Sequence, residues 1–364
     1  RPSTLLDLYD TCRLVDKLEY IHQFGQTVIP TEISDLDDHD FNVAYALVSG
    51  TEKPFEMTFN RAQNIKGALE MFDIVLGGEG RFAKKPFCTF GGCPIVSPLK
   101  FAKDNLDVLV ETSRLGLIND IAIAPQAGAT APVTLAGTLA QVTAEGLACL
   151  AIVNFISPGC PMSFAIWPFI SDLRTGSFSG GSGEEALIIS AAVQIGKFYN
   201  LPTTVPSCMT DSKIPDAQAG YEKGISAVLA GLAGGNRILE SAGMLGSLMG
   251  CSFEALVIDN DMLGAVQRII RGIEVNEETL SVNVIKDVAL GAGHYLGHKQ
   301  TLDHMQSEFL YPKIADRSSP SVWEEEGSKD IMDRAHETVQ KILSKNYPDH
   351  ITSKKDKNLR EKFP

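Results

Sequence analysis

Polar side chains follow several of the apolar runs that the sequence predicts to be strands. Gln126 and Thr130 lie in the loop after the run 120–124, and Asn154 and Phe155 end the next apolar run. These loops are rich in Gly, Pro and neutral dipoles and carry no charge. One such loop is explained by the residues that turns ordinarily contain. Two in succession favour a binding site for a ligand with a large, mostly apolar or uncharged face.

The loop 211–218 is the most polar of these strand-end loops. Asp216 precedes a helical pattern and is a residue type that favours the N-cap, so that a structural role explains it. Asp211 and Lys213 are the better candidates for contact with a ligand. Tyr221 would face the same cavity from the helix that follows.

Two histidines have a spacing that can bind a metal. His294 and His298 are four residues apart on a predicted helix, where two imidazoles can converge on zinc. Position 295 is Tyr, however, and not the Glu that acts as general base in zinc hydrolases of this type. Histidines that pack or lie on the helix surface are the favoured interpretation. We therefore expect no tightly bound metal.

Short apolar runs alternate with helical patterns along most of the chain. The predicted strands are 72–76, 87–90, 120–124, 150–155, 203–207 and 236–240, and the predicted helices are 99–115, 134–148, 184–199, 216–232 and 253–272. Such alternation is typical of a parallel sheet covered by helices. Because no nucleotide-binding glycine motif follows a strand, the pattern favours an α/β fold of the (β/α)8 TIM-barrel type, with extra N- and C-terminal helices.

The barrel prediction divides the chain into three parts. Residues 1–65 are predicted to be N-terminal helical packing elements, with an upstream stretch missing because the sequence begins without Met. Residues 66–320 are the predicted barrel and catalytic domain. Residues 321–364 are highly charged and predict a C-terminal helix followed by a solvated tail.

Charge is placed unevenly along the chain. The 364 residues carry a net charge of −13, which argues against a nucleic-acid binder. Residues 121–170 contain one charged side chain, Glu145, yet prolines and turns divide them, so that we expect buried strands and not a membrane span. The seven Cys form no disulfide framework, and no signal peptide is evident, so the cytoplasm is the predicted location.

Longer stretches of the sequence resemble the trimethylamine methyltransferase family. They are residues 124–137 (APQAGATAPVTLAG), 211–222 (DSKIPDAQAGYE) and 256–260 (LVIDN), with a terminal pattern from His294 to Trp323. The resemblance covers nearly the whole chain. It implies a (β/α)8 barrel that moves a methyl group from a methylated amine to Co(I) of a corrinoid (cobalamin), which a separate partner protein carries.

The chain resembles the branch of this family that lacks pyrrolysine, since only standard residues occur. This branch implies a quaternary amine as methyl donor, and glycine betaine, which would give dimethylglycine, is the first candidate. A quaternary ammonium releases a neutral tertiary amine, whereas neutral trimethylamine would need its nitrogen activated. Trimethylamine, proline betaine and carnitine stay open as donors. A barrel that binds quaternary amines without catalysis and a zinc hydrolase are the alternatives of other classes.

We expect aromatic faces to hold the ammonium group and donors to hold a betaine carboxylate. The aromatic candidates are Phe155, Phe164, Trp167 and Tyr221; the carboxylate candidates are Lys213, Arg237 and His298, with Gln126, Thr130 and Asn154 as neutral donors. The motifs name no catalytic residue. The expected partners are the corrinoid protein, the amine and further copies of this chain, with no nucleic acid and no membrane.

Overall fold

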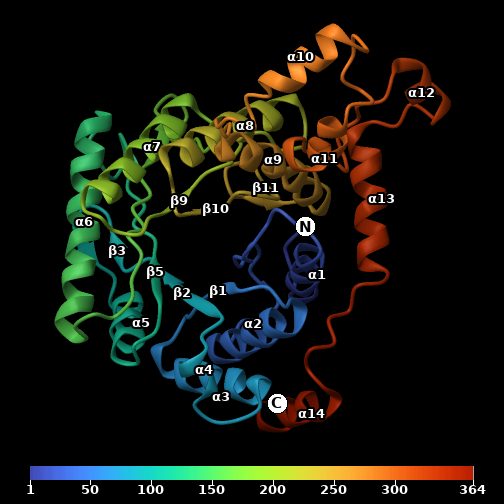
Figure 1. Cartoon of the computed structure of the whole chain (residues 1–364). Helices are drawn as coiled ribbons and strands as arrows, with labels where there is room; N and C mark the ends of the chain where they lie inside the picture. The colour runs from blue at the N-terminus through green and yellow to red at the C-terminus, as the bar shows by residue number, and fades with distance from the viewer. Residues whose placement is uncertain (364) are drawn as a thin grey trace.

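The computed structural model describes residues 1–363 and shows a mixed α/β fold (Figure 1). The strands are β1 (Phe55–Thr58), β2 (Cys88–Gly92), β3 (Ile95–Val96), β4 (Lys100–Phe101), β5 (Asn119–Ile121), β6 (Gln126–Ala127), β7 (Phe169–Asp172), β8 (Ser177–Phe178), β9 (Thr204–Pro206), β10 (Arg237–Leu239), β11 (Met244–Leu245) and β12 (Gly250–Cys251). Most of them lie toward the middle of the molecule, and the longer helices lie around them.

Fourteen α-helices and one 3-10 turn occur in the described residues. They are α1 (Leu5–Asp16), α2 (Leu36–Gly50), η1 (Ala62–Asn64), α3 (Ile65–Leu76), α4 (Arg81–Lys84), α5 (Lys103–Arg114), α6 (Leu135–Ile156), α7 (Gly183–Phe198), α8 (Ala217–Ala233), α9 (Phe253–Arg271), α10 (Val282–Leu290), α11 (Lys299–Glu308), α12 (Pro320–Glu325), α13 (Ile331–Leu343) and α14 (Ser353–Lys362).

Parallel pairing joins seven backbone segments side by side in chain order. β1 pairs with the backbone at Phe24 on one side and with β2 on the other, in a register that places Phe55 opposite Cys88. β2 pairs with β5, and isolated bridges continue the set through residues 162–166 to β9 and β10. Among residues 1–363, no backbone pairing joins β10 back to Phe24, so these hydrogen bonds do not close a ring.

Several predicted elements are confirmed. β2, β5, β9 and β10 lie where the sequence predicts strands, and α7, α8 and α9 lie where it predicts helices. The strand predicted at 72–76 is wrong, because these residues are the last part of α3. Gly77 ends that helix in the left-handed conformation, with φ 89°, which is the usual role of a glycine after a helix.

Helix α6 differs most from the sequence prediction. It runs unbroken for 22 residues through 150–155, so the strand predicted there is wrong. The strand of this unit is the segment 162–166, which pairs with neighbours on both sides. Gly146 lets α6 approach this segment, because a Cβ there would lie 2.7 Å from Ile166 Cγ2. The prediction failed because a continuous apolar run has no period that separates a buried strand from a helix.

By length and composition, α6 is the one described helix that could cross a membrane. The prolines of residues 121–170 all lie outside α6. They therefore do not divide this apolar stretch into short strands, as was predicted from the sequence. Its most apolar window is only 28% buried in the structure. A single helix of this length and composition is weak evidence for a membrane span, since core helices of globular domains have the same properties.

Residues 1–65 contribute strands as well as helices. The expectation of helical packing elements alone is wrong at Phe24 and β1, both of which belong to the parallel set. β1 alternates between buried Phe55 and Met57 and more exposed Glu56 and Thr58. That period of two was the available signal for a strand.

The C-terminal segment packs against the main core. α13 lies against α9 and α1, and α14 lies against α3 (Figure 1). Ala335, Val339 and Leu359 are buried in the core cluster that also contains residues of α1 and α2. The tail predicted at 354–362 is therefore a docked helix, held by its one buried apolar side chain. The domain boundaries at 65 and 320 stay predictions.

Candidate functional site

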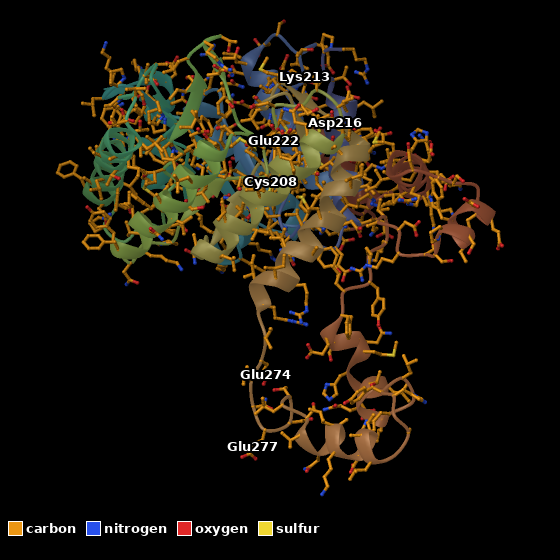
Figure 2. The ribbon with its side chains drawn as sticks, turned by 90° about the horizontal axis from the view of Figure 1, so that it is seen from above. Cys208, Lys213, Asp216, Glu222, Glu274 and Glu277 are labelled. Carbon is orange, nitrogen blue, oxygen red and sulfur yellow. The ribbon has the colours of Figure 1, made fainter. Side chains whose placement is uncertain are left out.

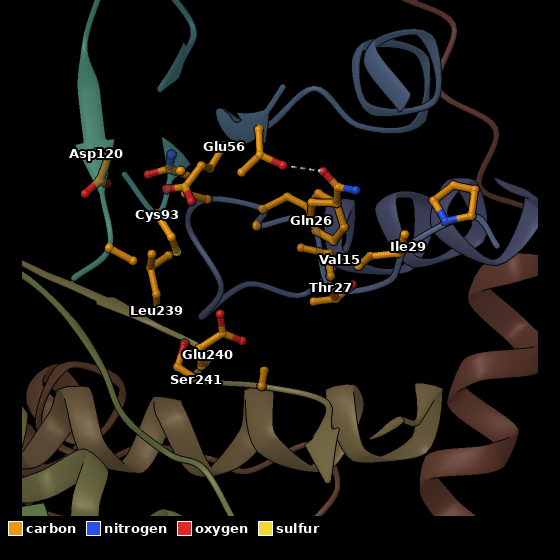
Figure 3. Close-up of a pocket in the computed structure, with 18 of the residues that line it drawn as sticks. Val15, Gln26, Thr27, Ile29, Glu56, Cys93, Asp120, Leu239, Glu240 and Ser241 are labelled. Carbon is orange, nitrogen blue, oxygen red and sulfur yellow. Dashed lines mark hydrogen bonds between the residues drawn. The ribbon is translucent and has the colours of Figure 1, made fainter. Parts of the chain in front are cut away.

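A cavity of about 650 Å³ lies at the carboxyl ends of the parallel segments (Figure 3). Thr58, Gly92, Ala122, Trp167 and Leu239 line it, each from the end of a different segment. The chain from 23 to 36 forms another part of its wall. In α/β proteins this edge is where loops assemble ligand and catalytic sites.

Three acidic side chains line the cavity, and one arginine joins two of them. The acidic residues are Glu56, Asp120 and Glu240. Arg237 extends from β10 to Asp120 on β5 and to Glu56 on β1, where Nη2 lies 2.8 Å from Glu56 Oε2. That contact is an ion pair without hydrogen-bond alignment. Two carboxylates therefore share one guanidinium.

Glu240 is the carboxylate that no cation neutralises. Among residues 1–363, no hydrogen bond or ion pair engages its side chain, and burial raises its pKa. Burial also raises the pKa of Glu56, although the charge of Arg237 opposes that rise. No Lys or Arg lines the cavity in the described chain, so its ionised groups leave a surplus of negative charge. Such a site favours a cationic ligand.

The backbone conformation of Glu240 is uncommon. Its φ is 57°, in the left-handed region that costs a residue with a side chain about 1–2 kcal/mol. The residue follows β10 directly, and Figure 3 shows its carboxylate pointing from the strand end into the cavity. Strain of this kind persists where surrounding structure fixes it, which happens often at ligand sites.

The facing wall offers neutral donors. Gln26 Oε1 accepts a hydrogen bond from Thr58 Oγ1 at 3.4 Å, while Gln26 Nε2 has no partner among residues 1–363. Thr27 Oγ1 is buried, also without a partner in that range. Nearby, Asn60 Nδ2 donates to Asp40 and lies 3.1 Å from His39 Nδ1.

Cys93 also lines the cavity, at the end of β2. Burial raises the pKa of its thiol, and the negative charge of Glu56 raises it further. A raised pKa lowers the fraction of the thiol that is present as reactive thiolate. The residue is exposed and forms part of the cavity wall.

The residues predicted from the central loops lie elsewhere. Thr130 Oγ1 accepts from the Gln126 amide of its own turn at 2.8 Å, and the Gln126 side chain accepts from Ser171 Oγ on β7 at 2.9 Å. Asn154 and Phe155 end α6, and the ring of Phe155 is 91% exposed. Their predicted place at a strand end is wrong, because α6 carries them away from the ends of the parallel segments.

The polar loop before α8, with Lys213 and Asp216 labelled in Figure 2, contributes no residue to the cavity lining. Lys213 is exposed, and its Nζ donates to the backbone oxygen of Asp211 at 2.6 Å. The Asp211 carboxylate accepts from Ser179 Oγ at 2.6 Å. Asp216 caps α8, as its residue type indicates, and Tyr221 on that helix is exposed.

The histidine pair does not share a helix. His294 lies in the loop between α10 and α11, and His298 caps α11, where its Nδ1 accepts from the Gln300 amide at 3.1 Å. The predicted i, i+4 geometry is therefore wrong. Within residues 1–363 no group of three or more His, Cys, Asp or Glu side chains is placed to hold a metal ion.

Of the predicted aromatic and charged residues, two lie at the cavity. Trp167 lines it and donates Nε1 to the Thr204 oxygen at 3.2 Å, and Arg237 pairs with two of its acidic groups. Phe164 is a core side chain. Glu56 and Glu240 were not among the residues predicted for the site. Glu240 ends a predicted strand and Glu56 lies in the alternating pattern of β1, and these were the available signals.

The family model described as "Trimethylamine methyltransferase (MTTB)" matches residues 1–363. The chain belongs to this family. It is 32% identical to a glycine betaine methyltransferase of Desulfitobacterium hafniense (strain Y51), over 99% of this chain and 74% of that protein. It is 34% identical to the trimethylamine methyltransferase MttB of Methanosarcina thermophila, over 93% of this chain and 69% of that protein.

A further family member is the trimethylamine methyltransferase MttB of Desulfitobacterium hafniense (strain DSM 10664 / DCB-2), 31% identical over 99% of this chain and 72% of that protein. Among solved structures, a dihydropteroate synthase of Xanthomonas albilineans aligns with a TM-score of 0.43 and 11% identity, over 74% of this chain and 86% of that one. A TM-score of that size assigns no fold.

Proposed function

We propose that this protein transfers a methyl group from a quaternary methylated amine to the reduced corrinoid of a separate protein. Glycine betaine is the first donor to test, because a family relative bears that name. The corrinoid supplies a cobalt nucleophile that takes the methyl group while the C–N electron pair stays on nitrogen. The nitrogen leaves as a neutral amine, so the chain need not supply a proton.

The observation that carries this proposal is the anionic cavity at the carboxyl ends of the parallel segments. Its volume suits a small ligand. A quaternary ammonium has no N–H, so it is recognised by charge and shape. Glu240 offers the charge, and Trp167 and other apolar side chains offer the shape. The cavity holds the amine, and the partner must present cobalt at its opening.

We propose that the parallel set is a (β/α)8-type barrel. The seven segments lie in chain order with helices outside them. The side chain of Arg237 supports closure, because it joins β10, the last member of the set, to β1 near the first. In an open sheet these strands would lie at opposite edges.

The decisive experiment mixes the protein with a corrinoid protein reduced to Co(I) and adds one amine at a time. Methylation of the corrinoid is followed by its absorbance. Glycine betaine is expected to react and to yield dimethylglycine. Turnover of trimethylamine without glycine betaine would identify the second candidate donor, which two relatives carry in their names. Tight binding of betaine without any methyl transfer would reject the proposed reaction and favour the alternative, a protein that binds quaternary amines without catalysis.

We also propose that the chain forms homo-oligomers through residues 273–311. This segment projects from the body, as the positions of Glu274 and Glu277 show (Figure 2). It exposes large apolar side chains, such as Ile273, Leu290 and Leu296, each more than 80% exposed. A corrinoid partner must leave after each turnover, and transient interfaces are more polar than permanent ones. A second copy of this chain is therefore the occupant that fits.

We propose a cytoplasmic location. Co(I) is strongly reducing and is maintained only in a reducing compartment. All seven cysteines are unpaired in the structure, which agrees with such a compartment.

A further inference from the structure

The proposed function leaves open how the cavity recognises its donor. A betaine carries a cationic and an anionic end, and the sequence-based candidates for both ends mostly lie outside the cavity. The cavity wall itself, however, has two chemically different sides. Figure 3 shows Glu240 at the end of β10 and Gln26 on the segment that faces it.

We propose that the Glu240 carboxylate binds the quaternary ammonium group and that the Gln26 side-chain amide binds the carboxylate of a betaine. This inference rests on the proposed function and names the two ends of its substrate site. The donor is then held along one axis, with its methyl groups against the walls between these two residues.

Glu240 is proposed for the ammonium group, and not Glu56 or Asp120, because its carboxylate has no cationic or hydrogen-bonding partner among residues 1–363. Glu56 and Asp120 share Arg237, so their charges are partly compensated and their oxygens already face a cation. Asp120 is also hydrogen-bonded to Ser163. Glu240 has no such partner among residues 1–363, and its strained backbone fixes the carboxylate toward the cavity. Its charge is the one that a cation can take up.

Gln26 is chosen because its amide nitrogen is free while its oxygen is fixed. Thr58 donates to Oε1, which orients the amide so that Nε2 remains available. The neighbouring Thr27 hydroxyl is buried without a partner in the described chain, so this stretch holds donors that a ligand can satisfy. Arg237 cannot serve instead, since its guanidinium is shared by two carboxylates.

The test measures binding to the protein alone, by calorimetry, with glycine betaine and with tetramethylammonium, which lacks a carboxylate. Glu240→Gln is expected to weaken both ligands about tenfold or more, because an interaction with a charged group is lost. Glu240→Asp keeps the charge and is expected to restore part of the affinity. Gln26→Leu is expected to weaken glycine betaine several-fold and to leave tetramethylammonium unchanged.

Glu184→Gln is the matched control, because Glu184 is an exposed glutamate on α7 that does not line the cavity. Circular dichroism verifies that each variant folds. Unchanged affinity in Glu240→Gln, or no binding of either ligand to the native protein, would overturn the inference. Equal losses for both ligands in Gln26→Leu would overturn its second half. Normal binding without corrinoid methylation would instead reject the proposed function and leave this inference standing.

Discussion

The charge state of Glu240 controls the electrostatics of the cavity. Burial raises its pKa, so protonation begins at a higher pH than for an ordinary glutamate. Arg237 pairs with Glu56 and Asp120 and forms no ion pair with Glu240 in the described chain. When all three carboxylates are ionised, the single charge of Arg237 leaves an excess of two negative charges, and Glu240 is the carboxylate without a cationic partner among residues 1–363. A cationic ligand would stabilise these charges.

The first prediction concerns pH. Affinity for tetramethylammonium should fall as pH decreases from about 8 toward 5, because protonation of Glu240 removes the attracting charge. The raised pKa places this loss above the range of ordinary glutamates. Calorimetry across that range gives the profile.

The variant Glu240→Gln distinguishes the contribution of Glu240 to the pH dependence of affinity from the contributions of other groups at the cavity. Those groups are Glu56, Asp120, Arg237, His39 and Cys93. The variant should bind weakly at every pH with a flatter profile. An identical profile in the variant would assign the titration to one of the neighbours instead.

The second prediction is that Lys213→Ala leaves the affinity for glycine betaine unchanged. The structure supports this because Lys213 is exposed, bonds to a backbone oxygen of its own loop and does not line the cavity. The dissociation constant from calorimetry is the measurement. A several-fold weaker affinity would return Lys213 to the carboxylate role that the sequence suggests.

At the scale of elements, a buried ion pair joins two of the outer helices. Lys223 on α8 lies 2.5 Å from Asp259 on α9, and both are almost fully buried. Asp259 Oδ2 also accepts from the Gly243 amide at 2.8 Å. Burial raises the pKa of Asp259, against the charge of Lys223. This pair therefore links the helices that follow β9 and β10 to the loop after β10.

The third prediction tests that link. Lys223→Met should lower the free energy of unfolding by about 3–5 kcal/mol, since it leaves Asp259 buried without its partner. Urea denaturation provides the measurement. Adding Asp259→Leu should recover part of the loss, because two apolar side chains replace the pair. If Lys223→Met alone were as stable as the native protein, the unpaired Asp259 would have to be hydrated by water.

Element prediction succeeded where local patterns were distinct. α7 begins after Ser182, whose side chain caps the Glu185 amide, and it carries two glutamates in its first turn. β9 and β10 are short and bounded by turns. α6 was misjudged because apolar side chains surround the helix, so that no period distinguished helix from strand. The last part of α3 was misjudged because the short run 72–76 was interpreted apart from residues 65–71, with which it forms one helix that buries a single face.

At the scale of the whole molecule, the chain ends are tied together. Arg13 on α1 donates Nε to the Asn346 oxygen at 2.6 Å, and Asn346 Nδ2 donates to the Arg13 oxygen at 2.7 Å. α14 inserts Leu359 into the core beside residues of α2 and α3. The charged C-terminal segment thus packs against the N-terminal helices α1, α2 and α3.

The fourth prediction follows from that packing. Leu359→Ala should destabilise the protein by about 2–5 kcal/mol, as is usual for a buried leucine. Thermal unfolding measures the loss, and Lys357→Ala, at an exposed position of the same helix, is the control. Equal unfolding temperatures for Leu359→Ala and the native chain would mean that α14 does not dock in solution.

The fifth prediction concerns assembly. Residues 273–311 expose several large apolar side chains, and a permanent interface is the kind that buries such side chains. The native protein should therefore be an oligomer in light scattering. Leu290→Asp combined with Leu296→Asp should convert it to a monomer, whereas Glu277→Gln should not. A monomeric native protein would refute this assembly.

Local patterns and long motifs were enough to predict the alternation of strands and helices, the family and a stretch at 121–170 with a single charged residue. The set of side chains that share a cavity could be read only from the three-dimensional arrangement. Gln26, Glu56 and Glu240 are far apart in sequence, and the parallel pairing of β1 with Phe24 and the span of Arg237 bring them together. No local signal records such a meeting, because it depends on how the strands are arranged around one another.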